Sequence, residues 1–111
     1  TMEYTDVKSQ IEYGLEKIDE NRKIELSLKD FLYLHNLLAE LVRFFHQPMH
    51  YETLEDVNKF LGDYKNEGAF QLLSDTFHKK FQYRDIFPKD IVEMIDNSEF
   101  QNPNPPYYYK P

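Results

Sequence analysis

The apolar pattern of residues 28–47 limits what this chain can fold into more than any other feature. At about 100° per residue, the apolar side chains of this stretch cover roughly half of a helix circumference. They are Phe31, Leu34, Leu37, Leu38, Leu41, Val42, Phe44 and Phe45. An apolar sector this wide contacts more than one neighbouring helix. We therefore expect Leu38, Leu41 and Phe45 to be nearly buried.

A shorter helix and a linker precede this central helix. The pattern predicts a first helix from Thr5 to about Glu20, which Gly14 weakens by about 1 kcal/mol relative to alanine. Residues 20–30 alternate apolar and polar side chains, but a lone strand would leave its backbone groups unpaired. We interpret them as an extended linker. Ser27, with Asp30 three residues later, forms a capping-box pattern at the start of the central helix.

Three more helices are predicted after the central one. Thr53 opens a short helix with a second capping-box pattern, and Gly62 suits its carboxyl end. A longer helix is predicted over residues 67–83. The last helix begins after Pro88, which fits a first helical turn, and ends near residue 97.

These patterns predict an all-α fold, a compact bundle of four or five helices with non-parallel packing. The 111 residues allow one ordinary domain, which we assign to residues 1–100. Residues 101–111 are rich in proline and tyrosine and predict an extended tail biased to polyproline II. We expect this tail to dock on its own domain or on a neighbouring chain.

Composition and charge exclude several classes of function. Thirteen basic and 20 acidic residues give a net charge of −7, which argues against duplex nucleic acid as a direct partner. The absence of cysteine excludes disulfides, thiolate metal sites and thiol nucleophiles. No apolar run approaches the roughly 20 residues that span a bilayer, and no secretory signal is visible. We expect no membrane association and a cytoplasmic location.

The histidines offer one candidate metal site. His46 and His50 flank a proline, and Glu52 follows closely. His35 cannot join His46 on one zinc ion, because eleven residues of helix separate them by about 16 Å. A chelate built on the turn by His46, His50 and Glu52 remains an alternative. The favoured interpretation is a helix end followed by a turn.

Motifs for other chemistry are weak or absent. Asp75 and His78 have a spacing used in di-iron bundles, but no second such unit occurs, so an ordinary surface pair is favoured. The three glycines are scattered, and no serine lies in a nucleophile motif. We predict no catalytic residue, no cofactor and no metal, and an enzyme is the less favoured class.

The tail carries the candidate protein-binding residues. Pro105, Pro106, Tyr107 and Tyr108 match the Pro-Pro-x-Tyr form of a WW-domain ligand, and Tyr109 extends the aromatic run. Three consecutive tyrosines need an apolar groove, so we favour a docked tail over a free peptide ligand. A groove on a second copy would make the protein a homodimer through the tail.

Two functions remain open from the sequence. The leading hypothesis is a small acidic protein that binds another protein without catalysis, in a regulatory, inhibitory or immunity-type role. Imitation of nucleic acid by acidic faces is a special case of it. The alternative is a small metal-dependent protein or enzyme that uses His46, His50 and Glu52.

Overall fold

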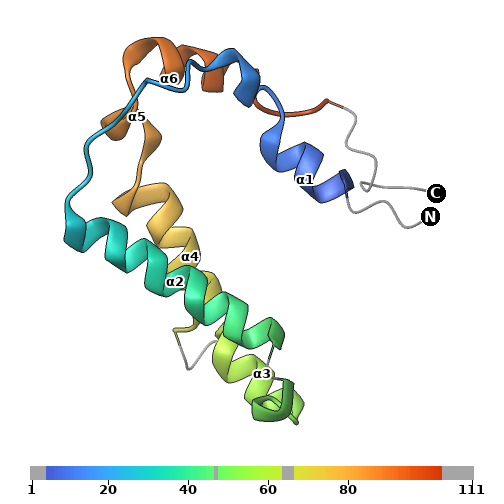
Figure 1. Ribbon diagram of the computed structural model, residues 1–111. Coiled ribbons are helices and arrows are strands. Elements are labelled where there is room, and N and C mark those ends of the chain that lie inside the picture. Colours follow the sequence, from blue (N-terminus) through green and yellow to red (C-terminus); the bar gives the residue numbers. More distant parts are fainter. Residues whose placement is uncertain (1–4, 47, 64–66, 104–111) are drawn as a thin grey trace. The chain divides into compact units, whose positions relative to one another are not determined.

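The computed structural model of the protein describes residues 5–46, 48–63 and 67–103 (Figure 1). Every regular element within these ranges is helical, which confirms the predicted all-α class. The chain divides into two compact units, and each is described by itself. Unit 1 combines the two ends of the chain, up to residue 24 and from residue 87 onward. Unit 2 comprises residues 25–86.

Unit 1 contains α1 (Thr5–Glu12), the 3-10 turn η1 (Leu15–Lys17) and α6 (Lys89–Asp96). The prediction that the first helix continues to about residue 20 was wrong, because Gly14 ends it. Gly14 has a φ of +83°, a left-handed conformation that costs little only for glycine. It also lies so close to the backbone of Glu99 that a Cβ atom would collide there.

Two ion pairs join the distant segments of unit 1. The Lys17 ammonium lies 3.3 Å from a carboxylate oxygen of Glu99. The Arg22 guanidinium donates two hydrogen bonds to Asp90, at 2.5 and 2.9 Å. Both carboxylates belong to α6 or the turn after it, so the N-terminal segment is held against the C-terminal one.

Unit 2 begins at the linker and contains α2 (Leu28–His46), η2 (Pro48–His50), α3 (Leu54–Leu61), α4 (Ala69–Asp75), η3 (Thr76–Lys80) and α5 (Tyr83–Ile86). The predicted helix starts are confirmed by their caps. The backbone N–H of Asp30 donates to Ser27 Oγ at 3.0 Å, and Thr53 with Asp56 forms the full capping box of α3. Gly62 ends α3 with a φ of +105°.

The helix predicted over residues 67–83 changes its winding at residue 76. The element η3 is a π-helical turn that continues α4, and Phe81 closes it by donating its N–H to the Thr76 carbonyl at 2.8 Å. Thr76 is buried, and its hydroxyl donates to the Leu72 carbonyl at 2.6 Å. Such back-bonding by threonine perturbs a helix locally, which fits the widened turn beside it.

One face of α2 packs within unit 2. Leu37 is only 9% exposed, while Leu34, Leu41 and Phe44 are half-buried on the same side. The Phe44 ring stacks on Phe60 of α3 with centroids 4.5 Å apart and 6° between the planes. These contacts fix the C-terminal half of α2 against α3. We call this side of α2 the inner face.

The prediction that Leu38 and Phe45 are nearly buried was wrong. Leu38 is 53% exposed and Phe45 is 77% exposed, while Leu41 is half-buried. The reason is geometric, since Leu38 lies about 100° around the helix from Leu37. The wide apolar sector of α2 therefore meets helices of unit 2 on one side only.

Candidate functional site

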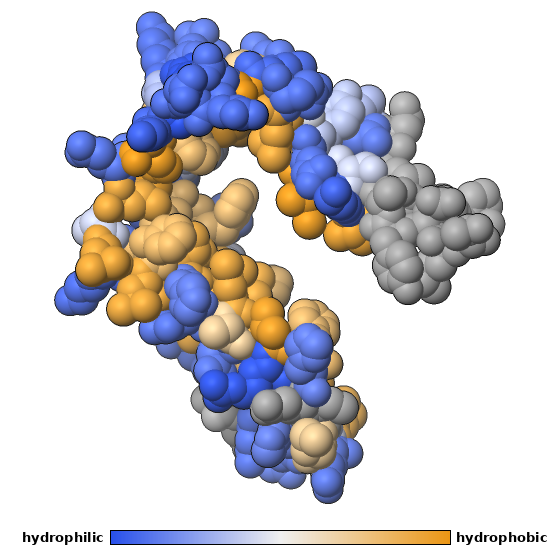
Figure 2. Space-filling model, in the orientation of Figure 1, coloured by the Kyte–Doolittle hydropathy of each residue, from blue (hydrophilic) through white to orange (hydrophobic). Residues whose placement is uncertain are grey.

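The uncovered side of α2 carries a regular row of apolar side chains. We call this row the α2 seam. Its members follow one another at alternating steps of three and four residues, the spacing by which a helix presents a continuous stripe to another helix. They are Leu28, Phe31, His35, Leu38, Val42 and Phe45, and all six are exposed. Figure 2 shows apolar surface along most of α2 on the face in view.

The α2 seam offers a large part of the apolar area that a specific interface needs. Its five apolar members are each at least half exposed, with Leu28 at 83%. Side chains of this size offer on the order of 100 Å² each, a substantial share of the roughly 800 Å² that each partner contributes to a stable interface. Scattered exposed apolar residues need no explanation, whereas a continuous apolar stripe is a candidate contact surface.

A second exposed apolar group lies on α4 and its π-helical continuation. Phe70, Leu73 and Phe77 are spaced at i, i+3 and i+7, and all three are exposed. We call them the α4 face. The inward side of the same segment carries Thr76, which is 4% exposed. The segment is held to α2 by the Lys80 ammonium, which lies 3.3 Å from the Asp30 carboxylate.

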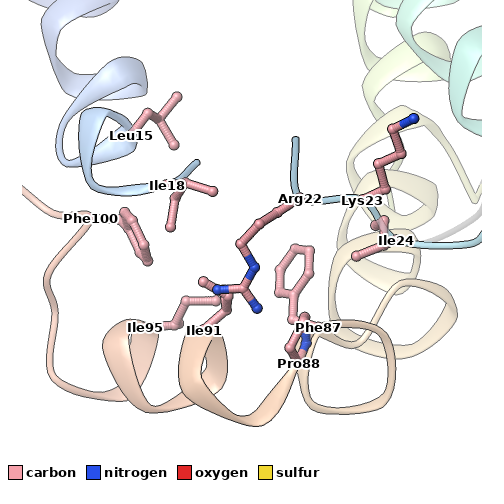
Figure 3. A pocket seen from close by; sticks show the side chains of 10 residues that line it. All are labelled: Leu15, Ile18, Arg22, Lys23, Ile24, Phe87, Pro88, Ile91, Ile95 and Phe100. Carbon is pink, nitrogen blue, oxygen red and sulfur yellow. The ribbon is translucent and has the colours of Figure 1, made fainter. Parts of the chain in front are cut away.

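Unit 1 contains an apolar pocket of about 320 Å³ (Figure 3). Arg22 crosses it between Ile91 and Phe87, while the Lys23 ammonium points away from it. The carboxylate of Asp90 neutralises the guanidinium, so the pocket offers no unpaired charge from Arg22. The apolar lining consists of Leu15, Ile18, Ile24, Phe87, Pro88, Ile91, Ile95 and Phe100.

The ion pair beside this pocket shifts the acidity of both partners. The hydrogen bonds from Arg22 lower the pKa of the Asp90 carboxyl below its ordinary value, against the opposing effect of desolvation. The same bonds and the negative charge of Asp90 raise the pKa of the Arg22 guanidinium. This pattern is typical of a structural ion pair, because both groups keep the charge they have at neutral pH.

The structure does not assemble the alternative histidine site within the described residues. His46 ends α2, His50 ends η2 and Glu52 follows it, and all three side chains are exposed. Within residues 5–46, 48–63 and 67–103, no three histidine, aspartate or glutamate side chains lie close enough to hold a metal ion. The helix end and turn favoured from the sequence are what the chain forms there.

Asp75 is engaged by other residues than His78. Its carboxylate accepts a hydrogen bond from Gln71 Nε2 at 3.2 Å and lies 3.7 Å from the Lys79 ammonium. The His78 ring instead meets the edge of Phe77, with centroids 4.9 Å apart. These are contacts of an exposed helix surface.

The predicted tail site lies outside the described residues. Pro105, Pro106, Tyr107, Tyr108 and Tyr109 all follow residue 103, where the described part of the chain ends. Their predicted role in protein binding is neither supported nor opposed by the geometry of the helices.

Comparisons with known proteins return nothing for this chain. No protein-family model, no curated protein and no solved structure matches it. In the described ranges, no helix combines the length and the apolar character that crossing a membrane requires.

The α2 seam is the feature that sequence reasoning missed. Four of its six residues were identified as part of one broad apolar sector that was expected to contact neighbouring helices. Leu28 and His35 were not counted in that sector. The alternating spacing of three and four residues divides the apolar sector into two rows, the inner face and the α2 seam. Both rows have this spacing. Spacing alone does not say which row is covered, because that depends on where the other helices pack.

Proposed function

We propose that this chain is a small acidic protein that binds another protein without catalysis, in a regulatory, inhibitory or immunity-type role. The proposed contact surfaces are the α2 seam and the α4 face. The observation that carries the proposal is the exposure of large apolar side chains at regular helical spacing on both helices. Surfaces of this kind bind helices or apolar grooves of partner proteins.

The character of the exposed residues supports a protein as the ligand. Phe31, Phe45, Phe70 and Phe77 are all more than half exposed, and aromatic side chains are enriched at protein interfaces. The net charge of −7 disfavours nucleic acid, because phosphate binding needs a concentrated basic surface.

Several finer predictions from the sequence remain proposals. They are a compact bundle with residues 1–100 as a single domain, a cytoplasmic location, and a tail in which Pro105, Pro106 and Tyr107 to Tyr109 dock on this chain or on another. A compact bundle would cover the α2 seam with helices of the same chain. The measurements proposed for the α2 seam distinguish that arrangement from pairing with a partner.

Affinity capture with a matched pair of variants tests the proposed function. Phe70→Lys places a charge in the α4 face, whereas Asn58→Lys adds the same charge at an exposed position of α3. We expect a protein from native extract to be retained by the wild type and by Asn58→Lys and lost from Phe70→Lys. Equal retention by all three chains would contradict a role for the α4 face in binding.

A further inference from the structure

We propose that the α2 seam binds the α2 seam of a second copy of this chain, with the two helices antiparallel. This inference rests on the proposed protein-binding function and names one of its partners. It leaves the α4 face to a different protein. Four features of α2 lead to it: the symmetry of the seam, the size of its residues, its charge and its area.

The spacing of the seam residues is the same in both directions along the helix. Its steps are three, four, three, four and three residues, so the row is symmetric about the point between Asn36 and Leu37. A two-fold axis at that point makes an antiparallel partner bring every seam residue opposite another seam residue. The layers pair Leu28 with Phe45, Phe31 with Val42, and His35 with Leu38, one residue from each copy.

Residue size favours this register over a parallel one. In the antiparallel pair the large Phe31 ring meets the small Val42, and each His35 meets the apolar Leu38. In a parallel pair every residue would meet its own copy, which would place the two His35 rings together at the centre. Antiparallel helices also bring opposite ends of their dipoles together.

The charge of α2 permits two copies to approach. The chain as a whole carries −7, so two copies repel one another over most of their surface. Within α2, however, Lys29 and Arg43 balance Asp30 and Glu40, and Arg43 lies 3.3 Å from Glu40. The seam therefore lies on a helix without net charge, where like copies meet with the least repulsion.

The area and shape of the seam also suit self-pairing. A two-fold interface uses the same patch on both subunits, so each partner contributes the apolar area of one seam to the interface. Beyond the helix end, Met49 is also apolar and 64% exposed.

Sedimentation analysis over a dilution series tests the proposal on the full chain. We expect the wild type to sediment with the mass of two chains and Leu38→Asp with the mass of one, because the variant buries an unpaired carboxylate at the central layer. Asn36→Asp adds the same charge to the polar side of α2 and should keep the mass of two chains.

A variant that strengthens the dimer shows whether the seam residues pair, because misfolding can only weaken the dimer. His35→Leu replaces the one polar member of the seam by an apolar one. We expect the dissociation constant of its dimer to be about one-tenth of the wild-type value or smaller. Helix content measured by circular dichroism should be the same for Leu38→Asp and Asn36→Asp. A weaker dimer for His35→Leu would contradict the proposal.

A wild type with the mass of one chain at all concentrations overturns the inference, and the melting temperature of Leu38→Asp then identifies the reason. An unchanged temperature leaves the seam free for a different protein, so the proposed function stands. A large decrease means that helices of the same chain cover the seam. The proposed function itself fails separately, when capture does not depend on Phe70.

Discussion

At the scale of single residues, the pair of Arg22 and Asp90 gives unit 1 a defined response to pH. Its two hydrogen bonds lower the pKa of the Asp90 carboxyl in the folded chain. An acid whose pKa falls on folding stabilises the folded state while it is ionised. This contribution is therefore present above the ordinary pKa of aspartate and is lost as pH falls through the lower, folded value.

We predict that Asp90→Asn lowers the melting temperature slightly at pH 7 and hardly at all at strongly acidic pH. The effect is small because both side chains are about half exposed, where water screens the attraction. Thermal melts of wild type and variant at several pH values measure it. Glu93→Gln serves as the control, because it neutralises an exposed carboxylate of the same helix. A difference in melting temperature between wild type and Asp90→Asn that grows as pH falls would contradict the prediction.

Single residues also show where sequence reasoning succeeds. Ser27, Thr53 and Gly62 were predicted as helix caps and act as such, because a cap depends on neighbours within a few residues. Gly14 was predicted to weaken a helix and instead ends it. Its conformation is coupled to the close approach of Glu99, which lies far away in the sequence.

At the scale of elements, α2 is a helix with two apolar rows and only one covered. Leu37 belongs to the inner face and Leu38 to the α2 seam, although they are adjacent in the sequence. The existence of the helix and the width of its apolar sector were predictable from periodicity, and its start was predictable from the capping-box pattern of Ser27 and Asp30. The division of the sector was not, because it depends on where α3 and α4 pack.

We predict unequal losses of stability for these two neighbours. Leu37→Ala removes a buried side chain and should lower the free energy of unfolding by about 2–4 kcal/mol. Leu38→Ala should lower it by less than about 1 kcal/mol, provided that the protein is dilute enough to have the mass of one chain. Urea unfolding of both variants measures the difference. Equal losses would mean that the α2 seam is covered within the chain.

A second element, η3, also differs from the expectation because of contacts that lie outside the apolar pattern. The π-helical turn η3 begins at the buried Thr76, whose hydroxyl bonds to the Leu72 carbonyl, and apolar periodicity does not predict such a turn. The histidines of the candidate metal site, His46 and His50, were correctly assigned to a helix end and a turn. Their residue types suggested a metal site, but only the folded structure shows whether their side chains lie close enough to form one.

At the scale of the whole molecule, the question is what covers the apolar surface of unit 2. The sequence favoured a core closed within one chain and placed protein binding in the tail. The tail lies outside the described residues, and within them α2 exposes a symmetric row of side chains on a helix without net charge. In the proposed dimer, the antiparallel pairing of two α2 seams covers this row.

Cysteine cross-linking tests this pairing most directly, because the natural chain contains no cysteine. Leu28→Cys and Phe45→Cys are prepared separately, mixed at equal amounts and oxidised gently. In the antiparallel register each new cysteine lies opposite the other variant and about 25 Å from its own copy, since 17 residues of helix separate them. We predict a disulfide-linked dimer in the mixture and almost none with either variant alone. Cross-linking of Leu28→Cys to itself, or no cross-link in the mixture, would contradict the account.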